Sequence, residues 1–364
     1  MLPDCLASIR GVADEIVVVD TGSTDATTDI ARKAGARVYH FEWCDDFAAA
    51  RNAALDHARG RWVLQIDADE RLTALGGGPV DSVSLRRWLT NPPPQALAAD
   101  GITLSVRNVG EGVTDRAPAN RLFLRHSGRR YVRRIHETPF PGDTSWRLFG
   151  LVDIELLHIG YAPEVQGKKG KHERNLRLCE LAVRERPDDA EIHYYCGFEL
   201  DRARRKVEAL SHFAEAWNRM PPWLVGGGIW WKTLVALCEG LNTGGSAGLV
   251  LRLVVPLLER FPNVAHLHFL RGDALRLLGR SDEALACLHA ALVLPPAGVA
   301  FEPSTTKCYC WSAIGVIHEL AGRLDPAVQA YRQSLALGPT PFAESRLAAL
   351  QVTMQPSSAT STAC

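Results

Sequence analysis

The chain has 364 residues, and its 41 Lys plus Arg balance 41 Asp plus Glu, so the formal net charge at neutral pH is zero. This balance excludes the basic surface with which proteins wrap nucleic acid or bind an anionic membrane. Hydrophobic residues make up 46% of the chain and charged residues 23%, which is typical of a globular protein with about two domains.

The cysteines and the apolar segments indicate the compartment. Nine cysteines are scattered without a Cys-x-x-Cys pair, which favours a reducing compartment over a zinc ribbon or a disulfide framework. The first residues lack the apolar core of a signal peptide. The most apolar stretch, residues 249–258, is too short to span a bilayer and contains Arg252 and Pro256. The sequence therefore predicts a cytoplasmic protein without a transmembrane segment or a nucleic-acid partner.

The N-terminal part alternates short apolar runs with helical patterns that end at glycines. The expected strands span residues 15–20, 36–41 and 61–67. The expected helices span residues 24–35 and 47–59. This rhythm predicts an α/β domain with a mostly parallel sheet, similar in layout to a Rossmann fold. Additional, partly antiparallel strands are expected near residues 101–106, 121–125 and 147–158, before this part ends near Tyr161.

From about Lys168 the pattern becomes helical, and a repeat is visible. Three glycines are each followed twelve residues later by alanine and twenty-four residues later by proline. These triplets are Gly197, Ala209 and Pro221; Gly272, Ala284 and Pro296; and Gly315, Ala327 and Pro339. Small residues where two helices cross, followed by a proline that ends the pair, are typical of tetratricopeptide (TPR) repeats. A degenerate copy with a Gly-rich insert at residues 242–248 is expected between the first and second triplets.

These patterns predict three parts. An α/β domain is expected at residues 1–165, and TPR-like helical repeats are expected at residues 166–350. The Ser/Thr-rich residues 351–364 are expected to form a disordered tail.

Two carboxylates stand at the end of the third expected strand, in Gln65-Ile-Asp-Ala-Asp-Glu70. The carboxyl end of a strand in an open α/β sheet is where ligands bind. Asp67 and Asp69 there could hold a divalent cation together with a ribose, because Mg²⁺ and Mn²⁺ prefer oxygen ligands and share them with diphosphates. The bare Asp-x-Asp pattern is common by chance, and a solvated turn is the alternative interpretation.

A second acid ends the first expected strand, in Asp20-Thr-Gly-Ser-Thr-Asp25. A carboxylate at the end of a buried strand needs a partner, which a nucleotide base or ribose would supply. The alternative is that Ser23, Thr24 and Asp25 only cap the next helix. Another set of polar residues, Asp46, Arg51 and Asn52, opens the helix between the two acid-tipped strands, and an Arg there can contact a base or a phosphate.

In combination and in order, these motifs resemble family-2 glycosyltransferases of the GT-A fold, over residues 1 to about 180. The residues within these motifs are similar to those of the subgroup with appended TPRs. This subgroup includes lipopolysaccharide-core-type glucosyltransferases and enzymes that glycosylate bacteriocin peptides. Further segments that resemble this subgroup are Asp45-Asp-Phe-Ala-Ala-Ala-Arg-Asn52, Arg121-Leu-Phe-Leu-Arg125, Ile135-His-Glu137 and His158-Ile-Gly-Tyr161.

The resemblance implies roles for individual residues. Nucleotide binding would fall to Asp20, Asp46, Arg51 and Asp67. Metal binding, of Mg²⁺ or Mn²⁺, would fall to Asp67, Asp69 and His158. Glu137, or His136 beside it, would be the catalytic base that takes a proton from an acceptor hydroxyl or thiol. Alternatively, His136 and Glu137 are a surface pair and His158 is a packed strand residue.

The implied activity is inverting transfer of a sugar from a nucleotide-sugar donor, expected to be a UDP-sugar, to a glycan, peptide or protein. The TPRs would dock the acceptor or a protein partner. Two alternatives are a TPR scaffold with an inactive transferase domain and a sugar nucleotidyltransferase, although residues 20–25 argue against the latter.

One departure concerns the N-terminus. Family members begin with a further central strand containing an Asn-Glu pair, whereas this sequence opens inside the following helix. Either the true start codon lies upstream or the protein is shortened. If the protein is truly shortened, open sheet edges and an incomplete nucleotide site are expected.

Overall fold

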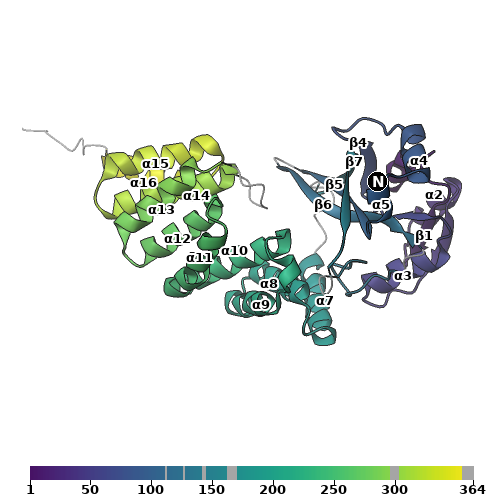
Figure 1. Cartoon of the computed structure of the whole chain (residues 1–364), viewed down its shortest axis with the longest axis horizontal. Helices are drawn as coiled ribbons and strands as arrows, with labels where there is room; N and C mark the ends of the chain where they lie inside the picture. The colour runs from purple at the N-terminus through teal and green to yellow at the C-terminus, as the bar shows by residue number, and fades with distance from the viewer. Residues whose placement is uncertain (111–112, 126–127, 142–144, 162–169, 296–302, 355–364) are drawn as a thin grey trace, which may run out of the picture. The chain divides into compact units, whose positions relative to one another are not determined.

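The computed structural model describes the chain except for residues 111–112, 126–127, 142–144, 162–169, 296–302 and 355–364 (Figure 1). The chain divides into two compact units, Met1–Arg205 and Lys206–Cys364. The predicted boundary near residue 165 lies outside the described residues, and the first two helices of the predicted repeat part belong to the first unit. The predicted tail lies outside them from residue 355, and its first residues end the last helix.

The N-terminal elements follow the predicted order. They are α1 (Leu2–Ser8), β1 (Val17–Asp20), α2 (Thr27–Lys33), β2 (Arg37–His40) and α3 (Phe47–His57). The two strands pair in parallel, and Val17 lies opposite Arg37. A glycine is needed after α2, because the chain turns there at Gly35 with a left-handed φ of 87°.

The second sheet has five strands in the order β3-β6-β5-β7-β4. These strands are β3 (Trp62–Leu64), β4 (Glu70–Ala74), β5 (Gly101–Gly110), β6 (Val113–Leu124) and β7 (Leu148–Tyr161). The short helices α4 (Ser82–Thr90) and α5 (Pro94–Leu97) lie between β4 and β5 in the sequence. The α/β class is confirmed, but the strand directions are more mixed than expected. Only β5 and β7 pair in parallel in this sheet, because β6 follows β5 directly and returns beside it as a hairpin.

Residues on the two faces of β6 enter two different cores. Leu122 packs with Leu72, Ile102, Leu104 and Leu156 in the main core. The next residue, Phe123, is fully buried on the other face, where it packs with Ala48, Tyr131 and Phe140. The alternation of a strand thus ties the start of α3 and the residues after β6 to one face of the sheet.

Two strands, β1 and β3, lie at the ends of their sheets. Among the described residues, β1 pairs only with β2 and β3 only with β6, so each strand ends its sheet. A cavity of about 1020 Å³ is lined by both strands, from Val17 to Val19 and from Trp62 to Leu64. It is also lined by Asp67, Asp69 and His158.

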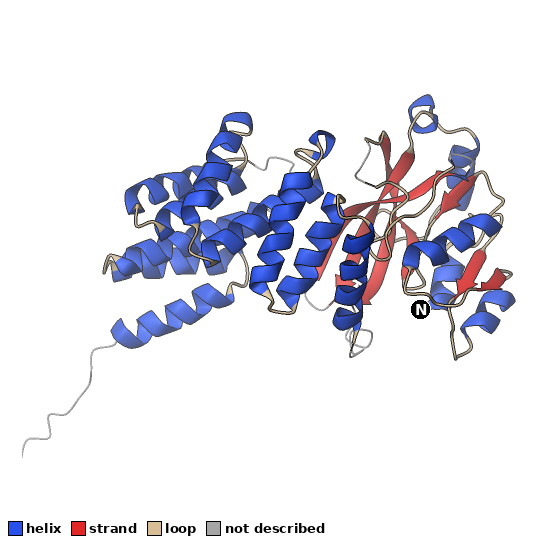
Figure 2. Cartoon of the chain, turned by 90° about the horizontal axis from the view of Figure 1, so that it is seen from below, coloured by secondary structure: helices blue, strands red, loops and turns tan. Residues whose placement is uncertain are grey.

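After β7, the described part of the chain consists mainly of helices (Figure 2). In the first unit, α7 (Lys171–Glu185) and α8 (Ala190–Arg202) form a hairpin. The helices of the second unit are α9 (Lys206–Arg219), α10 (Gly228–Thr243), α11 (Ala247–Arg260), α12 (Ala265–Leu277), α13 (Ser281–Val293), α14 (Pro303–Leu320), α15 (Leu324–Leu337) and α16 (Pro341–Met354). The degenerate repeat expected around residues 242–248 corresponds to α10 and α11, with the Gly-rich segment at their turn.

The predicted small residues lie where neighbouring helices touch. Ala284 and Ala327 are fully buried. A Cβ added at Gly272 would lie 2.9 Å from Leu288 Cγ, and one added at Gly315 would lie 2.5 Å from Tyr331 Cε1. These two copies therefore have the close helix crossing that TPRs require. Pro296 of the middle copy lies outside the described residues.

Every cysteine in the described part of the chain is free, and only Cys44 among them is exposed. Within the same residues, no helix combines the length and the apolar character needed to cross a membrane.

Candidate active site

Arg51, near the start of α3, connects two acids that are distant in the sequence. Its Nη2 donates to Asp67 Oδ1 over 2.9 Å, and its Nε donates to Glu137 Oε1. Its guanidinium carbon lies 5.7 Å from the centre of the Tyr131 ring. Burial acts to lower the pKa of Arg51, but Asp67 and Glu137 outweigh it and raise that pKa above its usual value. A permanent cation thus stands between the two carboxylates.

Asp67, just after β3, is surrounded by donors. Besides Arg51, Gln65 Nε2 donates to its Oδ1 over 2.9 Å, and Arg121 Nη1 donates to its Oδ2 over 3.5 Å. Arg121 also donates to the buried Glu70 over 2.8 Å. Burial acts to raise the pKa of Asp67, but Arg51 and Arg121 hold it below its usual value. Asp67 therefore carries a negative charge that is surrounded by protein donors.

Glu137 lies on a looped segment, residues 131–138, whose ends pair with each other. Val132 and Thr138 exchange backbone hydrogen bonds of 3.1 and 3.3 Å. The Asn52 side chain donates to Tyr131 O over 2.9 Å and accepts from Tyr131 N over 2.8 Å. Asn52 thus fixes this segment, called the 131–138 segment below, to α3 beside Arg51.

His136 differs from its neighbour in exposure and partners. Its ring stacks on Tyr195 of α8 with 3.8 Å between the ring centres. Its Nε2 is buried and has no hydrogen-bond partner among the described residues. Burial, with a contribution from Arg133, lowers the pKa of His136 to about 4, so this imidazole is neutral at physiological pH.

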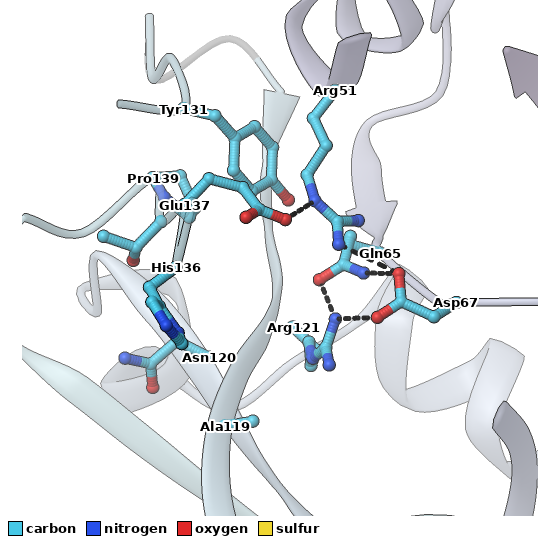
Figure 3. A pocket seen from close by; sticks show the side chains of 11 residues that line it. Arg51, Gln65, Asp67, Ala119, Asn120, Arg121, Tyr131, His136, Glu137 and Pro139 are labelled. Atoms are coloured by element: carbon cyan, nitrogen blue, oxygen red, sulfur yellow. Dashed lines mark hydrogen bonds and ion pairs between the residues drawn. The ribbon is translucent and has the colours of Figure 1, made fainter. Parts of the chain in front are cut away.

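These residues line a cavity of about 300 Å³ (Figure 3). Its walls include Arg51, Asp67, Arg121, His136 and Glu137. Figure 3 shows the Glu137 carboxylate pointing toward Arg51, with Asp67 on the far side of the guanidinium. Four segments far apart in the sequence therefore place charged groups around one opening.

Asp69 and His158 form a separate pair on neighbouring backbone. His158 on β7 lies opposite Glu70 on β4, and its Nε2 is 3.4 Å from Asp69 Oδ2. His158 Nδ1 lies 2.9 Å from Asn108 Oδ1, which can only accept, so Nδ1 carries the proton. Nε2 faces the Asp69 carboxylate, which can only accept, and the hydrogen bond to Asp69 raises the pKa of His158 above its usual value.

The chemistry of this pair fits a hard divalent cation. A carboxylate oxygen and an imidazole nitrogen stand side by side, and Mg²⁺ or Mn²⁺ completes its shell with water and phosphate. Asp67 does not join them. Among the described residues, no group of three or more His, Cys, Asp or Glu side chains is close enough to hold a metal.

Asp20 and Asp46 have local partners. Both Asp20 oxygens lie 3.2 Å from Ser23 N, and its Oδ2 also accepts from Gly22 N. Hydrogen bonds from Ser23 hold the pKa of Asp20 below its usual value. Asp46 caps α3 by accepting from Ala49 N over 2.9 Å. Neither residue lines the two cavities described above.

Sequence reasoning missed several residues of the cavity. Gln65 and Arg121 occur in motifs quoted for the resemblance, but neither was given a role. Tyr131 and Asn120 stand in no such motif, and only the fold brings them to the cavity. The alternation of β6 is the signal that could have found Arg121, because it lies next to the core residue Leu122 and so faces away from that core.

The comparisons with known proteins agree with the architecture. Residues 1–74 match the family model "Glycosyl transferase family 2". A "TPR repeat-containing protein" of Synechococcus elongatus is 34% identical over 203 residues, which are 54% of this chain and 47% of that protein. The glycosyltransferase SunS of Bacillus subtilis (strain 168) is 26% identical over 218 residues, 59% of this chain and 49% of that protein.

This chain spans about half the length of these two curated relatives. Among solved structures, a thermophilic TPR protein of Thermus thermophilus aligns with 50% of this chain and 92% of its own, at 26% identity and a TM-score of 0.37. Residues 1–74 are thus similar to glycosyltransferase family 2, and TPR-like helices follow in the C-terminal part of the chain.

Proposed function

We propose that this chain transfers a sugar from a nucleotide-sugar donor, with UDP as the expected nucleotide, to a hydroxyl or thiol of a glycan, peptide or protein. The observation that supports the proposal most directly is the convergence of Asp67, Arg51 and Glu137 on one cavity. A strand end, a helix start and a distant segment supply these three residues, as a site for a charged ligand requires.

The proposed reaction is a direct displacement with inversion. Glu137 would accept the proton of the acceptor as its oxygen or sulfur attacks the anomeric carbon, and the nucleoside diphosphate would leave. Arg51 and Arg121 would stabilise the negative charge that grows on the diphosphate. Asp67 would receive the ribose hydroxyls.

Asp69 and His158 would hold the Mg²⁺ or Mn²⁺ ion. When bound, that ion supplies Lewis acidity toward the leaving diphosphate. Both side chains line the larger cavity together with Asp67, so a donor bound there would reach both sites. Asp20 and Asp46 are proposed only as secondary contacts to the nucleotide, because their oxygens already accept backbone hydrogen bonds.

The helices of the second unit are proposed to dock the acceptor or a protein partner. Paired helices with close crossings at Gly272 and Gly315 form arrays that commonly bind peptides or proteins on an extended surface. The SunS relative is named a glycosyltransferase and the Synechococcus relative a TPR protein, which supports a chain that combines both functions.

The test is calorimetric titration of the purified chain with UDP, GDP and ADP, with and without Mn²⁺. We expect metal-dependent binding of UDP that is lost in Asp69→Ala. Asp29→Ala is the matched control, because Asp29 is an exposed acid on α2 outside both cavities. Equal binding by Asp69→Ala and the parent would refute the metal assignment. Absence of binding for all three nucleotides would contradict the transferase proposal and favour the scaffold alternative.

A further inference from the structure

The 131–138 segment contains two residues in a costly backbone conformation. Arg133 has a φ of 76° and His136 a φ of 53°, in the left-handed region that side chains other than glycine rarely adopt. Each such residue costs roughly 1–2 kcal/mol. The segment ends beside Glu137, which lines the cavity. Contacts from outside the segment must therefore hold this conformation.

Arg133 receives one of these contacts from the start of α8. Its side chain is only 2% exposed. Its Nε donates to Asp189 Oδ2 over 2.7 Å, its Nη2 donates to Asp189 Oδ1 over 3.0 Å, and Nη2 also pairs with Glu191. A buried guanidinium is stable only with such partners, so Arg133 keeps its place only while α8 is docked.

His136 receives the second contact from the same helix. Its ring lies parallel to Tyr195, with an angle of 8° between the planes. Tyr195 is one turn after Glu191, so both contacts come from the first part of α8. Arg133 and His136 are the two left-handed residues of the segment. Contacts from α8 therefore stabilise both strained backbone positions.

The α7 helix joins the hairpin to the same region. Arg177 donates to both oxygens of Asp45 over 2.7 Å, and the Arg174 guanidinium lies 5.4 Å from the Phe47 ring centre. Lys171 and Arg174 also line the larger cavity with Asp67 and Asp69. The hairpin is thus part of the wall around the proposed site. All of these residues lie in the first compact unit.

We infer that the α7–α8 hairpin positions the proposed base Glu137, with Asp189, Glu191 and Tyr195 acting as positioning residues through Arg133 and His136. The kinetic consequence of this inference rests on the proposed function, whereas its structural consequence does not. None of the three positioning residues lines the 300 Å³ cavity, so each acts through the 131–138 segment.

Two substitutions test the inference, one at each of the two contacts that α8 makes with the segment. Tyr195→Leu removes the stacked ring, and Tyr195→Phe is its conservative partner. Asp189→Asn removes the charge opposite Arg133 while keeping a residue that caps helices well, because Asp189 also accepts from Glu191 N and Ile192 N. Glu180→Gln is the matched control, since it breaks an exposed pair of the same hairpin, with Arg205, that includes no residue of the segment.

Hydrogen–deuterium exchange is the structural measurement. We expect Tyr195→Leu and Asp189→Asn to speed exchange in residues 131–138, where the amides of Val132 and Thr138 are otherwise bonded to each other's carbonyls. Tyr195→Phe and Glu180→Gln should match the parent. Unchanged exchange in both test variants would overturn the inference. Faster exchange over the whole of residues 1–205 would also overturn it, because that result indicates general unfolding.

Kinetics provide the second readout. A displaced Glu137 should lower kcat for sugar transfer by about 10–100-fold, while the KM for the donor changes by less than about twofold. Tyr195→Phe should restore kcat. A rise in the donor KM at constant kcat would contradict a positioning role. If the parent itself transfers no sugar, the proposed function fails, and the exchange comparison still decides whether the hairpin holds the segment.

Discussion

Arg51 and Glu137, 86 residues apart in the sequence, form an ion pair in which Arg51 Nε donates to a carboxylate oxygen of Glu137. The same guanidinium donates to Asp67. In this arrangement an oxygen of Glu137 is engaged by a cation rather than by an acceptor hydroxyl. A diphosphate would attract Arg51 more strongly than either carboxylate, because it carries more charge. Donor binding is therefore expected to draw Arg51 away from Glu137, which frees that carboxylate to act as the base.

This linkage predicts a loss of donor affinity in Arg51→Gln. The variant lacks the charge that would pair with the diphosphate, so UDP should bind about 10–100-fold more weakly, as expected for a hydrogen bond between charged groups. Calorimetry with Mn²⁺ present measures this change. Arg32→Gln is the control, because Arg32 is an exposed residue of α2 that pairs only weakly with Asp29. Equal affinities in Arg51→Gln and the parent would rule out a phosphate contact.

Glu137→Gln separates chemistry from binding. The amide keeps the size of the side chain but accepts no proton, so kcat should fall by about 10²–10⁴-fold. UDP should still bind to within about threefold, because Arg51 and Asp67 remain. Initial rates of transfer together with calorimetry measure both quantities. Glu42→Gln, an exposed acid outside the two cavities, should behave as the parent. Normal turnover in Glu137→Gln and its loss in His136→Gln would move the role of base to His136.

The pair of Arg133 and Asp189 predicts a pH dependence of stability. Burial acts to raise the pKa of Asp189, but Arg133 holds it below its usual value. A carboxyl whose folded pKa is lowered contributes stability above its unfolded pKa, about 3.9, and loses it as the pH falls through the folded value. The parent should therefore melt at a higher temperature than Asp189→Asn at about pH 6–7. This difference should shrink below about pH 4. A constant difference across this range would mean that the charge of Asp189 does not stabilise the fold.

Local patterns were enough to predict the first strands and helices. The run of residues 15–20 and the helix after Phe47 are continuous in sequence, so their type follows from neighbouring residues. The length of β6 was underestimated, because it begins at Val113 rather than near Arg121. Its first half carries charge: Arg116 on β6 and Arg107 on β5 pair with Glu155, which is fully buried on β7. Charged residues that pair across strands occupy positions where strand prediction expects apolar residues, so the alternation is not visible in the sequence.

The same limit applies to the candidate site. Asp67, Arg51 and Glu137 each stand in a local motif, so their chemistry could be inferred, and the structure brings these three together. The pairing of Arg133 with Asp189 and the stack of His136 on Tyr195 could not be inferred. These contacts join the end of one predicted domain to the start of another, and neither partner carries a pattern that identifies the other.

The helix crossing at Gly315 supplies a prediction for the second unit. A Cβ at this position would lie 2.5 Å from Tyr331 Cε1 and 2.7 Å from Cδ1, and the Tyr331 ring is fully buried. The ring has little room to move, because Tyr331 also donates to Glu319 over 2.8 Å. Gly315→Ala should therefore lower the free energy of unfolding by about 1–3 kcal/mol, even though alanine favours helix.

Thermal unfolding measures this effect, and a glycine with open surroundings provides the comparison. Gly248 lies in α11, and nothing stands within 4 Å of a Cβ added there. Gly248→Ala should be neutral or should stabilise the chain by up to about 1 kcal/mol, because alanine is the better helix former. Gly315→Ala should lower the melting temperature by several degrees, at roughly 2–4 °C for each kcal/mol in a unit of this size. Equal melting temperatures for the two variants would show that α14 and α15 are not in close contact at this glycine.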